Sequence, residues 1–136
     1  MAMWHEAYLG KPWSGTPNPP ESFNCGELVR YFYAVDSGYS CLPIPVPDAR
    51  NLRDCVEAMN PSYFGLVPVE GEPQDKDAVF LSKRRMMDHC GLAVIDRGRL
   101  YILHCSQRGG VQLSTPGELR AQGWTGFSWW RRPANG

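Results

Sequence analysis

The sequence has no excess of charge of either sign, because 14 lysine and arginine residues balance 14 aspartate and glutamate residues. Proteins that bind nucleic acid through their overall charge carry a basic excess, so we expect no nucleic-acid partner. No apolar run has the length that crosses a bilayer, which predicts no membrane insertion. The first residues lack a basic stretch followed by an apolar segment, so we expect a chain made in the cytoplasm without a signal peptide.

Close pairs of cysteines are also missing. The five cysteines form no Cys-x-x-Cys pair and their number is odd. Cys41 and Cys55 could pair, but nothing in the sequence fixes the distance between them. We therefore expect free thiols and a reducing compartment. No phosphate-binding glycine loop, internal repeat or low-complexity segment is present, and the length predicts one domain over residues 1–136.

The order of the expected elements indicates an α+β fold. Residues 10–22 hold four prolines and two glycines, which predicts a loop. Helices are expected over 24–36, ended by Gly38, and over 48–59, with an extended, proline-rich connection between them. The remainder reads as short strands over 63–69, 78–81, 90–95, 99–104, 111–113 and 127–132, with a short helical turn over 114–120. Helices followed by an antiparallel sheet define the α+β class.

Cys25 stands at the expected start of the first helix. Asn24 is a strong N-cap residue, and Glu27 three positions later completes a capping-box pattern. Unpaired backbone N–H groups and the positive end of the helix dipole would then surround Cys25. Both favour a thiolate over a thiol, so we expect a lowered pKa and a strong nucleophile rather than a buried structural cysteine.

His89 and His104 lie in two strands that flank a hairpin signal at residues 96–98. A pair of histidines suits a general base and a residue that fixes its tautomer. Their geometry depends on the turn, because a one-residue change of register moves a side chain to the other face. A three-residue loop at 96–98 places the two histidines on opposite faces, whereas a four-residue loop at 95–98, or a bulge, places them on the same face.

A zinc site is the competing interpretation of the cysteines and histidines. Structural zinc sites usually contain close ligand pairs. The only close pairs here are His89-Cys90 and His104-Cys105, and adjacent residues of a strand point to opposite faces. We therefore expect no metal and no other cofactor.

Several blocks, taken in order along most of the chain, resemble the NlpC/P60 cysteine peptidases, in particular the compact phage-tail type. The blocks share the family's order and spacing. Residues 9–15 resemble the aromatic, glycine-containing loop before the nucleophile, and residues 23–30 resemble the nucleophile helix, which usually reads Asp-Cys-Ser-Gly-Leu-Val. Residues 76–81 resemble the Gly-Asp-Leu-Val-Phe-Phe strand, residues 88–94 the Ser-His-Val-Gly-Ile-Tyr strand and residues 126–131 the terminal strand, while residues 103–106 follow where the family has its third polar residue.

The resemblance implies a papain-like fold with N-terminal helices packed on an antiparallel sheet, and a Cys-His-His endopeptidase. It implies Cys25 as nucleophile, His89 as general base and acid, and His104 as orienting residue. It also places a small set of residues at the substrate, namely Trp13, Asn24, Gly26 and Asp88. Asn24 stands where the family has Asp, and Gly26-Glu27 where it has Ser-Gly; the spacing from His89 to His104 is about three residues longer than usual.

The implied substrate is the stem peptide of peptidoglycan, usually cut between γ-D-glutamate and a diamino acid. We expect a phage or prophage tail-associated hydrolase that acts at the cell wall, with other tail proteins as possible partners. A tail-assembly or tail-tip component that keeps the fold with little or no catalysis is the alternative. A cytosolic enzyme that trims recycled wall peptides is a third interpretation.

Overall fold

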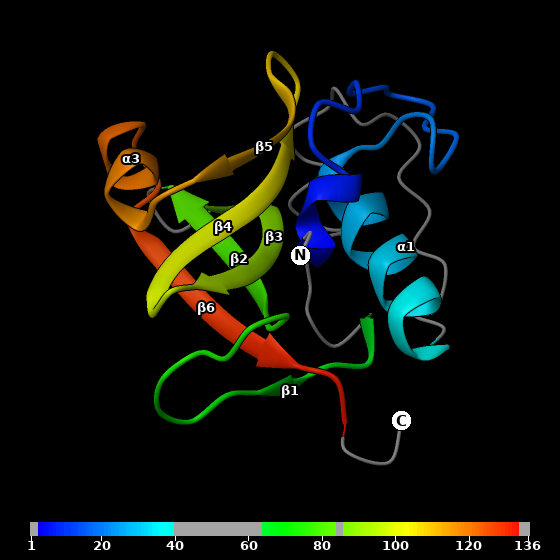
Figure 1. The fold of residues 1–136 in the computed structure, drawn as a ribbon. Coiled ribbons are helices and arrows are strands. Elements are labelled where there is room, and N and C mark those ends of the chain that lie inside the picture. The colour runs from blue at the N-terminus through cyan, green and yellow to red at the C-terminus, as the bar shows by residue number, and fades with distance from the viewer. Residues whose placement is uncertain (1–2, 40–63, 84–85, 134–136) are drawn as a thin grey trace.

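A computed structural model describes residues 3–39, 64–83 and 86–133 of the chain, and the fold is α+β. Within these ranges, two α-helices and a short 3-10 helix accompany six antiparallel strands (Figure 1). In chain order the elements are η1 (Trp4–Ala7), α1 (Cys25–Ser37), β1 (Val67–Pro68), β2 (Ala78–Lys83), β3 (Met86–Asp96), β4 (Arg99–Ser106), β5 (Gly110–Ser114), α3 (Pro116–Ala121) and β6 (Gly126–Arg131).

The six strands form one sheet in the order β1-β6-β2-β3-β4-β5. The strands β2 to β5 are neighbours in sequence and in space, and β6 returns to the other side of β2. Beyond β5, the loop before α1 continues the pairing, because Gly10 N–H donates to the Val111 carbonyl and Val111 N–H donates to the Lys11 carbonyl. This contact joins the N-terminal loop to the sheet next to the histidine-bearing strands.

Helix α1 has the N-cap and the glycine stop that the sequence predicts, and its bounds differ by one residue at each end from the expected 24–36. Asn24 is the N-cap, and its side-chain oxygen accepts a hydrogen bond of 2.8 Å from the Glu27 N–H. Gly38 ends the helix in a left-handed conformation with φ of 69°. The reciprocal half of the capping box is not formed, because the Glu27 carboxylate pairs with Arg30 instead of returning to the Asn24 N–H.

The sheet has a core on each face. Helix α1 packs against β3 and β4 (Figure 1). Leu28 and Phe32 of α1 share the larger core with side chains of these strands, among them Leu103 of β4. The core on the opposite face is smaller and is covered by α3, whose Leu119 packs with Val79 of β2. The sheet is therefore buried on both sides at its centre, which fixes β3 and β4 as rigid supports.

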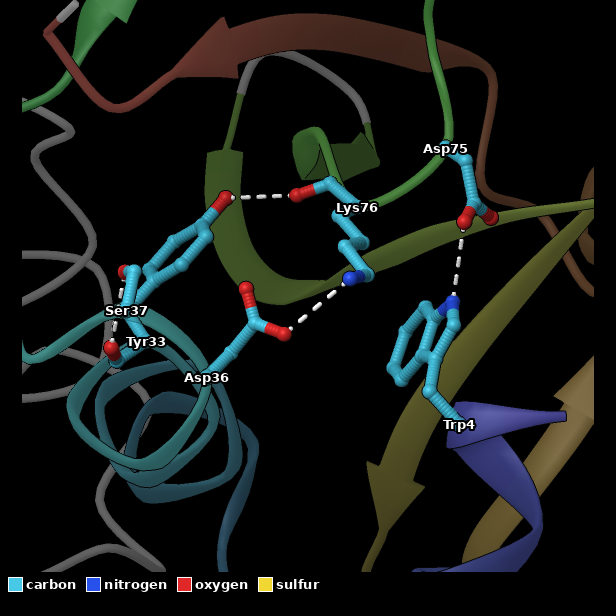
Figure 2. Close-up of polar contacts among 6 residues, drawn as sticks. All are labelled: Trp4, Tyr33, Asp36, Ser37, Asp75 and Lys76. Atoms are coloured by element: carbon cyan, nitrogen blue, oxygen red, sulfur yellow. Dashed lines mark hydrogen bonds and ion pairs between the residues drawn. The ribbon is translucent and has the colours of Figure 1, made fainter.

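Polar contacts hold the turn at residues 74–77 to η1 and α1 (Figure 2). The Trp4 indole N–H donates to Asp75, the Tyr33 hydroxyl donates to the Lys76 carbonyl, and the Lys76 ammonium pairs with Asp36. The next residue, the buried Asp77, accepts two hydrogen bonds of 2.7 and 2.8 Å from the Arg131 guanidinium at the end of β6.

The predicted strands are found, with different lengths. β3 and β4 extend beyond 90–95 and 99–104. Of the expected strand over 63–69 the structure describes residues 64–69, and within these only residues 67–68 are in a strand. The sequence did not predict η1, and the helical turn expected over 114–120 is α3, capped by Thr115. The expected helix over 48–59, the extended connection before it and the Cys41–Cys55 pair lie outside the described residues.

Candidate functional site

The start of α1 contacts both β3 and β4 near the point where the pairing between these two strands ends. The ladder between β3 and β4 ends at the pair Gly91–His104, although β3 continues back to Met86 and β4 continues to Ser106. Cys25 interacts with Cys90 of β3, and the carbonyl of Phe23 accepts a 3.4 Å hydrogen bond from the Cys105 thiol of β4. Cys25 is half-buried, and all three described cysteines are free thiols.

The surroundings of Cys25 favour its thiolate. The largest influence is a hydrogen bond from the Cys90 thiol, which lowers the pKa of Cys25, while burial raises this pKa. A hydrogen bond and charge from His89, and a hydrogen bond from the Cys90 backbone N–H, lower the pKa further. The net result is a pKa of Cys25 well below the ordinary value. The pKa of Cys90 is raised well above its ordinary value, because Cys90 donates to Cys25 and is buried.

His89 and His104 contact each other across β3 and β4. The distance from His89 Nε2 to His104 Nδ1 is 2.9 Å, and the ring planes meet at 86°. The hairpin turn consists of two residues, since Asp96 pairs with Arg99, so neither the three-residue nor the four-residue loop expected from the sequence is correct. Arg97 and Gly98 both have positive φ, at 54° and 78°, as this tight turn requires.

This register makes the two histidines diagonal neighbours on one face. His104 lies opposite Gly91, two residues along β3 from His89, and the period of two places 89 and 91 on the same side. The absence of a side chain at Gly91 leaves room for the contact, because a Cβ there would lie 3.1 Å from the Cβ of His104. The same-face arrangement therefore arises from a shifted register rather than from a longer loop.

The second ring nitrogen of His104 contacts Ser114 in β5. The distance from His104 Nε2 to Ser114 Oγ is 2.9 Å, and both side chains are buried. The pKa of His104 is lowered to about 3, mainly by burial and to a smaller extent by the charge of the nearby His89. His104 is therefore neutral at physiological pH and carries one proton for its two ring nitrogens.

One face of His89 is covered by an aromatic ring. Trp124 stacks on His89 with centroids 5.1 Å apart, and the Lys83 ammonium lies 4.2 Å from the Trp124 ring centroid. Nε2 of His89 faces His104, so Nδ1 is the ring nitrogen left for Cys25. This arrangement can remove a proton from a thiol at Nδ1 and hold the resulting imidazolium through Nε2.

Three of the four residues expected at the substrate, Trp13, Asn24 and Gly26, lie in α1 or in the segments next to its start. Trp13 is half-buried and forms a parallel bridge with Phe23, two residues before Cys25. The side-chain oxygen of Asn24 is occupied by the helix cap, and Gly26 is buried in the first turn. Asp88 directly precedes His89 in β3, and its side chain lies outside the described residues.

Three contacts of this site were not predicted from the sequence, those of Cys90, Ser114 and Trp124. Cys90 appeared only as a potential zinc ligand next to His89. The alternation of β5 could have indicated Ser114, since it pairs with Ile102 on the face of His104, but only after the register of β4 and β5 was known. No sequence signal links Trp124, in the turn before β6, with His89.

Within the described ranges, no group of three or more His, Cys, Asp and Glu side chains is arranged to hold a metal ion. In the same part of the chain, no helix is long and apolar enough to cross a membrane. Comparison of the chain with protein-family models and with curated proteins finds no match.

Proposed function

We propose that the protein is a cysteine peptidase of the NlpC/P60 type with a papain-like fold, in which Cys25 is the nucleophile, His89 the general base and acid, and His104 the orienting residue. The observation that carries this proposal is the connected series of contacts from Cys25 through His89 to His104. It combines a thiol of lowered pKa at a helix start with a histidine whose far nitrogen meets a buried, neutral histidine.

The first half of the reaction uses the groups around Cys25. His89 Nδ1 takes the Cys25 proton, and the thiolate attacks the carbonyl carbon of the scissile amide. The backbone N–H groups of Cys25 and Gly26 have no acceptor within the helix, so they are available to the oxyanion. His89 then gives its proton to the leaving amine, which departs as the carbon–nitrogen bond breaks and leaves a thioester on Cys25.

The second half returns the enzyme to its starting state. His89 takes a proton from water, which attacks the thioester carbonyl. Collapse of the tetrahedral intermediate breaks the carbon–sulfur bond and releases the acid product, and His89 returns its proton to the Cys25 thiolate. Throughout both halves His104 accepts the Nε2–H of His89 and keeps the ring aimed at the thiol.

The substrate class rests on the resemblance of the motif blocks. We infer hydrolysis of peptidoglycan stem peptides, between γ-D-glutamate and a diamino acid, by a phage or prophage tail-associated protein that acts at the cell wall. One backbone feature supports the resemblance of the block at residues 76–81. Lys76 has φ of 75°, a left-handed conformation that favours glycine, and it stands where the family pattern has the glycine of Gly-Asp.

The decisive experiment measures hydrolysis of purified peptidoglycan by mass spectrometry of the released fragments. The unaltered protein should produce fragments with a new amino group on the diamino acid, and Cys25→Ala should produce none while keeping its thermal midpoint. Ser37→Ala, at the far end of α1, is the matched control and should remain active. Fragments from Cys25→Ala, or none from the unaltered protein, would reject the proposal, and the second result favours the tail-assembly role.

Alkylation tests the nucleophile without a substrate. Iodoacetamide should modify Cys25 near neutral pH faster than any other cysteine of the protein. Cys90→Ala should move the reactivity of Cys25 to higher pH, because it removes the thiol hydrogen bond that most lowers the pKa of Cys25. Equal reactivity of all cysteines would exclude the assigned role of Cys25.

A further inference from the structure

Ser114 continues the series of buried polar side chains beyond His104. His89, His104 and Ser114 come from the adjacent strands β3, β4 and β5, and each lies diagonally from the next on one face of the sheet. Each step of the series measures 2.9 Å. Both ring nitrogens of His104 are therefore occupied, one by His89 and one by Ser114.

The direction of these two hydrogen bonds decides what His89 can do. A neutral imidazole has one donor and one acceptor nitrogen, whereas a hydroxyl can serve as either. For neutral His89 to take a proton from Cys25 at Nδ1, its own proton must be on Nε2, and this Nε2–H needs an acceptor at His104 Nδ1. The proton of His104 must then be on Nε2, from which it is donated to the Ser114 hydroxyl.

We propose that Ser114 is a positioning residue that accepts the Nε2–H of His104 and so keeps His104 Nδ1 as the acceptor for His89. Its role in catalysis rests on the function proposed above, whereas its effect on the tautomer of His104 does not. Ser114 acts through two intervening rings and has no contact with Cys25 among the hydrogen bonds described. Its side chain is buried and belongs to the last residue of β5 rather than to a loop, as precise orientation requires.

Removal of the Ser114 hydroxyl should reverse the direction of the hydrogen bond between His104 and His89. In Ser114→Ala the Nε2–H of His104 has no acceptor in a buried site, which is costly. The proton of His104 moves to Nδ1 and is donated to His89 Nε2. His89 must then carry its own proton on Nδ1, facing Cys25, where it can no longer take the thiol proton. The variant should keep the fold and lose the base.

The test is the tautomer of His104, read from the ¹⁵N chemical shifts of its ring nitrogens. The unaltered protein and Ser114→Thr, which keeps a hydroxyl, should show His104 protonated at Nε2, and Ser114→Ala should show it protonated at Nδ1. Ser106→Ala is the matched control, because the Ser106 hydroxyl contacts Gly109 and Gln112 rather than a histidine. An Nδ1-protonated His104 in the unaltered protein would overturn the inference even if Ser114→Ala did not fold.

Two functional measurements accompany the spectra. Alkylation of Cys25 should shift to higher pH in Ser114→Ala and be restored in Ser114→Thr. If the protein hydrolyses peptidoglycan, kcat of Ser114→Ala should fall on the order of ten- to a hundredfold, the range that loss of a buried hydrogen-bond partner supports, with little change in KM. Absence of hydrolysis in every variant would reject the proposed function alone, and an unchanged tautomer in Ser114→Ala would reject the role of Ser114.

Discussion

Acid should destabilise the protein through His104, and the size of the effect follows from its burial. The pKa of His104 is about 3 in the folded state because burial, and then His89, disfavour its charged form, whereas an unfolded chain restores the ordinary 6.5. Between these two values the unfolded state binds more protons than the folded state, so stability falls as the pH is lowered from about 6.5 toward 3. One pKa unit corresponds to about 1.4 kcal/mol, so lowering the pH from 7 to 4 should cost about 3 kcal/mol through this residue.

The assay is urea unfolding of the unaltered protein and of His104→Gln at pH 7 and pH 4. A loss of about 3 kcal/mol lowers the urea midpoint by about 1.5 M when the slope is near 2 kcal/mol/M. His104→Gln removes the titrating group while its amide can still accept from His89, so its midpoint should change less between the two pH values. An equal change in both proteins, or a His104 proton resonance that titrates near pH 6.5, would refute the reasoning.

The remaining predictions concern the residues that surround the thiol and the histidine pair. Glu27→Gln should leave the pH–alkylation profile of Cys25 nearly unchanged, because the Glu27 carboxylate is already paired with Arg30. Arg30→Ala should shift that profile to higher pH, because it leaves the negative charge of Glu27 unpaired near the thiol. A shift with Glu27→Gln alone would show that Arg30 does not screen the Glu27 charge from Cys25. Gly91→Ala should reduce the proposed hydrolysis and lower stability by about 1–3 kcal/mol, because a Cβ would lie 2.5 Å from a carbonyl oxygen of β4 and 3.1 Å from the Cβ of His104. Unfolding and activity assays on one preparation measure both effects. Full activity would show that His104 is not displaced.

The local part of the fold could be predicted because its signals lie within a few residues. The N-cap at Asn24 and the left-handed stop at Gly38 each need only the adjacent helix turn. The capping box failed on a competing local contact, since Arg30 lies one turn from Glu27 and a guanidinium attracts the carboxylate more strongly than a neutral N–H does. The pattern gave the correct residues there and the wrong partner.

The histidine contact could not be predicted, because it depends on one register and one empty position. The residues Asp96-Arg97-Gly98 indicate a hairpin but do not fix its length, and a change of one residue reverses the face of His104. The structure has Arg97, a non-glycine residue, at positive φ in a two-residue turn, and Asp96 stays in β3, whereas each loop length considered from the sequence placed Asp96 in the turn.

The separation of β3 from β4 is a tertiary feature, and it explains why the candidate site forms at this point. While two strands remain paired, their facing N–H and C=O groups are used by the ladder. Past Gly91 and His104 the two strands have no pairing with each other, and the Cys90 N–H contributes to the environment of Cys25. The start of α1 brings its own unpaired N–H groups to the same place. Two sets of backbone donors thus converge on a half-buried thiol, and burial of an anion there costs less than it would in an apolar core. The lowered pKa of Cys25 therefore depends on the end of the β3–β4 ladder as much as on its position in α1. A substitution that extends that ladder should raise the pKa of Cys25 without changing the helix.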